Sequence, residues 1–275
     1  MSQLSENLTL VSIVLYSLSA LLYALMWLRS SKTLRIGAPL VLVAGFIVNF
    51  FQLLSRWHEA NQPPFKTLYE SLVLLSACIA IVYLVIEFIY RARILGLPAM
   101  LGAAGAMLYA FSRHDKEIVN LPPALQSGWF IPHVVVYFFG YAALFVAFCA
   151  AVLYLIRPKP IRIRREDLIP GEKIDLEKLL DGSVRFGFVL LTFGLLVGAV
   201  WAKMAWGDYW VWDPKETWSL VTWLMFAAYL HLHYLGGWRG KRLAVLVVLG
   251  FVAVMFTYLG MNLLPTAEQS AHVYQ

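Results

Sequence analysis

Six tryptophans lie close together in the segment WAKMAWGDYWVWDPKETWSLVTW, residues 201 to 223, although the whole chain of 275 residues has only ten. Tryptophan favours the headgroup layer of a membrane, but an interfacial belt distributes aromatic residues over all helix ends, whereas these gather around one. A dense group of flat rings offers broad stacking contact to a large, flat, apolar ligand. A porphyrin and a quinone both fit that description, so the choice depends on residues that could bind iron.

Histidines are the natural candidates, because haem iron accepts imidazole as an axial ligand. His133 begins an apolar helical sequence, and His272 follows the last apolar run. His231 and His233 lie deep in the apolar run after the tryptophan segment, where an ionisable residue is a functional candidate by default. Two positions apart on a helix, they take roughly opposite faces, so only one should point into the bundle. The other two histidines lie in charged loop sequences and are reserve candidates: His58 and His114.

The elements that must position these residues are membrane helices. Hydrophobic residues make up 61% of the chain and charged residues only 14%, which is far from the composition of a soluble domain. A bilayer core needs about 20 apolar residues in helical form. The sequence therefore predicts an all-α, polytopic membrane helix bundle of about eight transmembrane helices, forming one membrane domain over residues 1–275. The expected spans are residues 8–28, 36–55, 67–90, 95–112, 131–156, 186–205, 217–236 and 243–264.

Positive charges predict the orientation, because Lys and Arg in short loops gather on the cytoplasmic side. With the N-terminus outside, the inner segments carry 16 of the 22 Lys and Arg and the outer segments carry 6. We therefore expect both termini outside, an external tryptophan segment at residues 201–218 and a cytoplasmic connecting loop at residues 157–185. The net charge of +6 then reflects cytoplasmic anchoring rather than nucleic-acid binding.

Two short polar sequences predict helix starts. Asp213 precedes Pro214 and is followed three residues later by Glu216, which places an N-cap, a proline at the first helical position and a capping-box glutamate in order. Thr67 and Glu70 have the same spacing. We expect both carboxylates to cap helices, a role that does not exclude a second one at a ligand site.

Residues 206 to 242, WGDYWVWDPKETWSLVTWLMFAAYLHLHYLGGWRGKR, closely resemble the tryptophan-rich WWD motif and following helix of the CcsA (ResC) family of System II cytochrome c biogenesis. Further matches lie in PFKTLYESL (64–72), HVVVYFFGYAALF (133–145) and MNLL (261–264). The tail departs from the usual Gly-Leu-His-Ser-Tyr, so the match of His272 depends on its position and on Tyr274. The resemblance implies a haem-transporting protein in a cell (plasma or inner) membrane of a bacterium, or in the thylakoid membrane of a plastid.

The resemblance also implies the site residues. Haem b is the transported substrate, and its iron takes outer axial ligands from His133 and His272. His231, rather than His233, matches the membrane-embedded histidine of the family. The porphyrin is bordered by the motif residues Trp206, Trp210, Trp212, Asp213 and Trp218.

The partners implied are a CcsB-like membrane protein, also called ResB or Ccs1, and apocytochrome c, whose Cys-x-x-Cys-His motif receives haem through thioether bonds. No nucleophile or general acid for that reaction is visible in the sequence. We therefore expect part of a holocytochrome c synthase complex that is inactive alone. Two alternatives stay open: a quinone-binding membrane oxidoreductase subunit, and a haem exporter without synthase activity.

Overall fold

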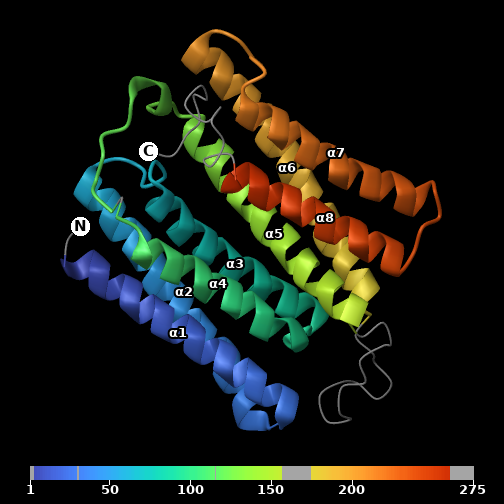
Figure 1. Cartoon of the computed structure of the whole chain (residues 1–275). Helices are drawn as coiled ribbons and strands as arrows, with labels where there is room; N and C mark the ends of the chain where they lie inside the picture. The colour runs from blue at the N-terminus through green and yellow to red at the C-terminus, as the bar shows by residue number, and fades with distance from the viewer. Residues whose placement is uncertain (1–2, 30, 115, 157–174, 261–275) are drawn as a thin grey trace. The chain divides into compact units, whose positions relative to one another are not determined.

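The computed structural model describes residues 3–29, 31–114, 116–156 and 175–260. Within these ranges the chain forms helices and no strand (Figure 1), which confirms the predicted all-α fold. The α-helices are α1 (Gln3–Leu28), α2 (Lys32–Ala60), α3 (Leu68–Tyr90), α4 (Gly96–Ser112), α5 (Phe130–Ile156), α6 (Leu176–Trp206), α7 (Pro214–Tyr234) and α8 (Lys241–Tyr258). Two short 3-10 turns are η1 (Arg93–Leu95) and η2 (Pro123–Leu125).

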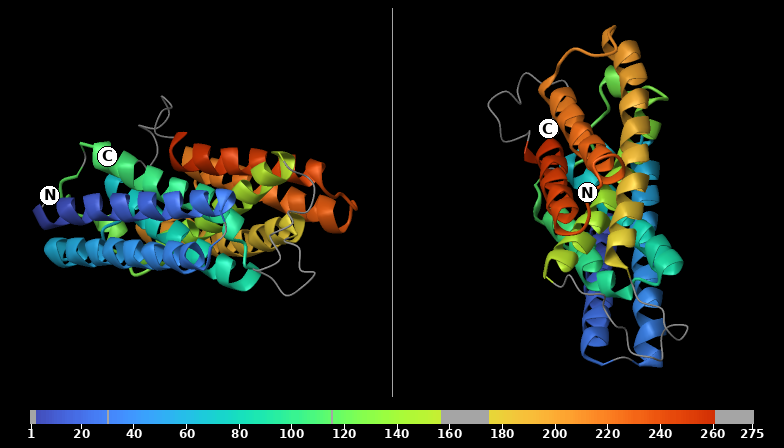
Figure 2. Two further views of the ribbon diagram at one scale, coloured as in Figure 1. Left: turned by 90° about the horizontal axis from the view of Figure 1, so that it is seen from below. Right: turned by 90° about the vertical axis from the view of Figure 1, so that its right-hand side faces the viewer.

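The described helices belong to two compact units, one containing α1 to α4 and the other α5 to α8. In the first unit, α1 and α3 each pack against both α2 and α4. In the second, α5 and α7 each pack against both α6 and α8. Each unit is therefore a closed ring in which neighbours in sequence are neighbours in space, as the pairs α1–α2 and α7–α8 show in Figure 2.

Helix α1 distributes its residues in the way that lipid favours. Hydroxyl side chains line its buried face at spacings of three and four residues, whereas large aliphatic side chains such as Val14 and Leu21 are exposed. Lipid tails are as apolar as leucine, so helices in a membrane associate through packing and polar contacts rather than by hiding apolar surface. The buried hydroxyl residues are Ser5, Thr9, Ser12, Tyr16, Ser19 and Tyr23.

Seven of the described helices are long and apolar enough to cross a membrane, with α4 counted together with η1. Helix α7 has a comparable length but is not among them, because its histidines, tryptophans and threonines lower its mean hydropathy. The chain is thus an integral membrane protein. The end of the expected last span, residues 261–264, lies outside the described residues.

Helix α6 is longer than the sequence predicted. It begins at Leu176, so the described end of the expected connecting loop, residues 157–185, is helical. Leu176, Leu179, Leu180 and Val184 are buried at spacings of three, one and four residues, a helical apolar face. Charged residues lie between these apolar positions and lower the mean hydropathy of the stretch, so the sequence did not predict a helix there.

Both predicted helix starts are confirmed. Asp213 is the N-cap of α7, and its capping box with Glu216 is complete. Thr67 is the N-cap of α3, with a complete capping box to Glu70. Capping of this kind satisfies backbone N–H groups that the first helical turn leaves unpaired.

Candidate functional site

His133 lies in the first turn of α5, with its ring directed at α6. Its Nδ1 is 3.0 Å from the carbonyl oxygen of Gly194. A carbonyl can only accept, so this hydrogen bond requires the proton on Nδ1. The neutral imidazole then has its lone pair on Nε2, the arrangement that metal-binding histidines adopt when a backbone carbonyl orients them.

Helix α6 forms a cradle around this imidazole, made by Gly194, Gly198 and Trp201. A Cβ atom at Gly198 would lie 2.5 Å from Cε1 of His133, so the ring occupies the space that the missing side chain leaves. The Trp201 ring stacks on the imidazole with centroids 5.5 Å apart and planes inclined by 29°. Trp201 is itself buried, and its Nε1 donates to the carbonyl of Ala124 at 2.9 Å.

The tryptophan segment continues this aromatic series. Trp206 ends α6 and packs edge-on against Trp201, with centroids 4.8 Å apart. The chain then turns at Gly207, whose φ of 92° suits only glycine. Trp210 and Trp212 follow in the loop, with their rings 5.9 Å apart.

Trp212 has an unusual backbone. Its φ is 58°, in the left-handed region, and 67% of the residue is exposed. A bulky residue in this region is a conformational outlier that costs about 1–3 kcal/mol and is concentrated at functional sites. The Nε1 of neighbouring Trp210 is buried without a hydrogen-bond partner in the described part of the chain. The loop thus presents an exposed ring and an unused donor.

The carboxylate of Glu216 holds the loop in place. Its Oε2 accepts from the backbone N–H of Val211 at 2.9 Å and of Asp213 at 3.2 Å. Asp213 in turn accepts from the N–H of Lys215 at 2.8 Å. The helix cap and the tryptophan loop therefore depend on the same two acidic side chains.

The last two tryptophans of the segment pack between helices. Trp218 lies against Phe256 of α8, with ring centroids 4.3 Å apart, and Thr257 donates to its carbonyl at 3.2 Å. Trp223 donates from Nε1 to Thr192 of α6 at 2.9 Å. The structure therefore brings His133 together with Trp206 through Trp201, and places Trp218 on the α7–α8 contact.

Histidines near the far end of α7 have opposite surroundings, as their spacing predicts. His231 is exposed. His233 is buried, with Nε2 3.4 Å from Asp181 and Nδ1 3.0 Å from Arg239. Its ring nitrogens already face polar partners, which leaves His231 as the more accessible imidazole. His272 lies outside the described residues.

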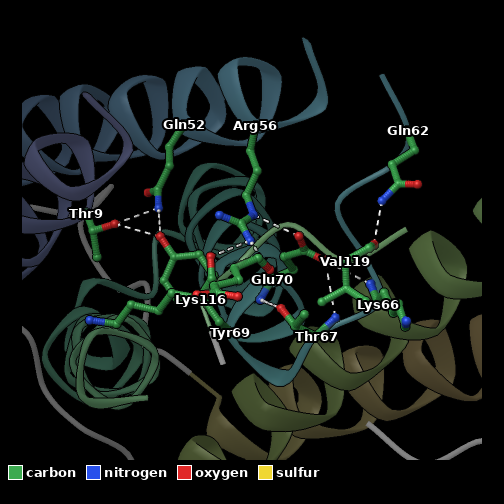
Figure 3. A network of polar contacts seen from close by, with 11 residues as sticks. Thr9, Gln52, Arg56, Gln62, Lys66, Thr67, Tyr69, Glu70, Lys116 and Val119 are labelled. Carbon is green, nitrogen blue, oxygen red and sulfur yellow. Dashed lines mark hydrogen bonds and ion pairs between the residues drawn. The ribbon is translucent and has the colours of Figure 1, made fainter. Parts of the chain in front are cut away.

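A second polar cluster lies in the first unit (Figure 3). The Arg56 guanidinium pairs with Glu70, Nε to Oε1, at 2.7 Å, and stacks 4.9 Å from the centre of the Tyr69 ring. Its Nη2 donates to the backbone carbonyls of Lys116 and Glu117, which follow α4. This cluster ties the α2–α3 connection to the segment that leads to the second unit.

Sequence reasoning missed Gly194, Gly198 and Arg56 and gave Trp201 no role at the iron site. The two glycines and Trp201 are spaced at i, i+4 and i+7, which places them on one face of α6. That spacing was a readable signal, but nothing in the sequence identified His133 as its partner.

Comparisons with a family model and with individual known proteins agree with one another. The family model described as "Cytochrome C assembly protein" matches residues 65–267. A protein of Prochlorococcus marinus (strain MIT 9215) named "Cytochrome c biogenesis protein CcsA" is 38% identical over 253 residues, covering 82% of each chain. A protein of Chlorella vulgaris with the same name is 36% identical over 257 residues, covering 81% of each.

The fold is also similar to that of a solved structure. "Cytochrome c Heme Lyase CcmF" aligns with a TM-score of 0.70 and 18% sequence identity. The alignment covers 93% of this chain but only 46% of that one. At this identity the likeness establishes the fold alone.

Proposed function

Because this chain belongs to the cytochrome c assembly protein family, in its CcsA group, we propose that it is the haem-handling subunit of a cytochrome c synthase. It takes haem across the membrane and presents it on the outer side for attachment to apocytochrome c. Haem b is its substrate and not a resident cofactor. We propose the orientation that the Lys and Arg distribution favours, with both termini outside and the tryptophan loop on the outer surface.

The single observation that carries this proposal is the hydrogen bond from Nδ1 of His133 to the Gly194 carbonyl, at 3.0 Å. It fixes the tautomer in which Nε2 can bind iron. The ring is also held on one face by Trp201. These features fit an imidazole prepared as an axial ligand, because they fix both the tautomer and the orientation of the ring.

The tryptophan loop supplies the surface on which a porphyrin would stack. Trp212 offers an exposed ring on a strained backbone, and Trp210 offers a buried N–H donor. A flat aromatic ligand can stack on the exposed Trp212 ring. We assign Trp206, Trp210, Trp212, Asp213 and Trp218 to this outer site, with His133 and His272 as axial ligands.

His231 is proposed as the ligand for haem on its way outward. It is exposed on α7, whereas His233 is engaged with Asp181 and Arg239. Since α7 begins at the tryptophan loop, one helix connects the proposed inner and outer sites.

The chemistry assigned to this chain is positioning. A thiol S–H of apocytochrome c adds across a haem vinyl group, with sulfur bonding to one carbon and hydrogen to the other, so the step needs no added oxidant. Holding the vinyl groups at a fixed place raises their effective concentration against the thiols. We propose a CcsB-like membrane protein as the necessary partner.

An absorption spectrum of the protein purified with its partner tests the proposal. We expect the Soret and α bands of bis-histidine haem, and weakened bands in the variants His133→Ala and His272→Ala. His114→Ala is the matched control, because His114 is exposed in a loop of the first unit and should leave the spectrum unchanged. A haem-free wild-type complex that instead binds quinone would refute the proposal.

A second assay separates a synthase from a simple exporter. Covalent cytochrome c should form when the chain is produced together with its CcsB-like partner and should be absent without it. Product formed by this chain alone would contradict the requirement for a partner.

A further inference from the structure

We propose that Gly198, together with Gly194 and Trp201, is a positioning device that sets the orientation and tautomer of the His133 imidazole. This inference rests on the proposed function, because it concerns how the outer iron ligand is held. It assigns to α6 a role that the tryptophan motif does not include. The three residues do not touch the haem and act only through His133.

The first argument is steric. An added Cβ at Gly198 would lie 2.5 Å from Cε1 and 2.7 Å from Nδ1 of His133, closer than real Cβ atoms approach other heavy atoms. The imidazole is confined on its other sides, by the Trp201 ring at 5.5 Å and by the edge of Tyr137 at 4.9 Å. The imidazole has no free space into which it can shift, so a methyl group at Gly198 must displace it from its position against α6.

The second argument is electronic. One of the two ring atoms that a Cβ would crowd, Nδ1, is the atom that donates to the Gly194 carbonyl. Displacing the ring breaks that hydrogen bond. The proton is then no longer held on Nδ1, and the tautomer with its lone pair on Nε2, the one that can bind iron, is no longer favoured. Loss of such a supporting contact typically costs 10–100-fold in metal affinity.

The third argument is the anchoring of Trp201. Its Nε1 donates to the Ala124 carbonyl and its ring packs against Phe130, the first residue of α5. The ring that stacks on the imidazole is thereby fixed to the backbone just before the helix that carries His133. The orientation of the His133 imidazole is therefore set both by the space at Gly198 and by the anchored ring of Trp201.

The test compares Gly198→Ala with Gly187→Ala, each purified with the CcsB-like partner. Gly187 is a matched control on the same face of α6, since a Cβ there would lie 2.7 Å from Leu144 and not near His133. We expect Gly198→Ala to bind haem about 10–100-fold more weakly, with a shift from a low-spin to a high-spin spectrum and a changed midpoint potential. Added imidazole should restore the low-spin bands, which a merely structural defect would not allow. Gly187→Ala should keep the wild-type spectrum and potential.

Trp201→Phe is the second variant, and it decides the question if Gly198→Ala does not accumulate. It keeps a ring beside the imidazole but loses the hydrogen bond to the Ala124 carbonyl. The midpoint potential and the haem affinity should therefore shift in the same direction as in Gly198→Ala, but by a smaller factor. Wild-type affinity and spectrum in both variants, or equal changes in Gly187→Ala, would overturn the inference. A wild-type complex without haem would instead refute the proposed function itself.

Discussion

Removing the charge of Glu70 should destabilise the first helical unit strongly. Its Oε1 lies 2.7 Å from Nε of Arg56, and the two side chains are only 5% and 2% exposed. In Glu70→Gln the amide oxygen can still accept from the N–H groups of Lys66 and Thr67. The amide NH2 then replaces Oε1 and faces the Nε–H of Arg56, so the variant loses both the charge and the hydrogen bond that balance the buried guanidinium. Breaking a buried pair on one side costs about 3–5 kcal/mol, and we expect roughly 3 kcal/mol because the cap survives.

The assay is reversible unfolding in mixed micelles, followed by circular dichroism. Arg56→Met combined with Glu70→Gln should recover part of the loss, because no uncompensated charge is left buried, with a coupling energy of about 0.5–3 kcal/mol. Glu59→Gln, an exposed carboxylate on α2, serves as the control and should stay within about 0.5 kcal/mol of wild type. Glu70→Gln stability within about 1 kcal/mol of wild type would refute the reasoning. Strictly additive losses in the double variant would also refute it.

Three further outcomes are expected in the second unit. Trp212→Gly should stabilise the protein by up to about 1 kcal/mol in thermal unfolding, because glycine accepts a positive φ, while weakening haem binding; unchanged haem affinity would contradict a role for this ring. Glu216→Ala should cost about 1 kcal/mol and speed proteolysis of the tryptophan loop, because Val211 loses its acceptor. Thr222→Val should cost about 0.6–1.7 kcal/mol in micelle unfolding through its 2.9 Å bond to Thr257 of α8, and no loss would show that this bond is replaced.

Much of the helical framework was predictable, because apolar runs and capping boxes are local signals. The starts of α3 and α7 follow from Thr67 and Asp213 with their glutamates, and the opposite surroundings of His231 and His233 follow from their spacing. The extension of α6 back to Leu176 was not predicted, because hydropathy averaged over a charged stretch hides a narrow apolar face. The choice of His231 for the inner haem depends on the family resemblance and stays a prediction.

The cradle on α6 could not be predicted for a different reason. A glycine in an apolar helix can serve close packing at any position, as Gly187 does against Leu144. That Gly198 faces the His133 imidazole depends on the register between α5 and α6, which is set by packing along their whole contact. The division into two four-helix units with the same neighbour order is likewise a property of tertiary contacts.

Whether Nε2 of His133 binds the outer haem iron is decided most directly by electron–nuclear double resonance on the oxidised complex, with histidine labelled by ¹⁵N at Nε2. Measuring in a His231→Ala background removes the proposed inner ligand. We predict strongly coupled nitrogens from two imidazoles in this background, and from one after the further change His133→Gly. The same two couplings with and without His133 would contradict its assignment as the iron ligand.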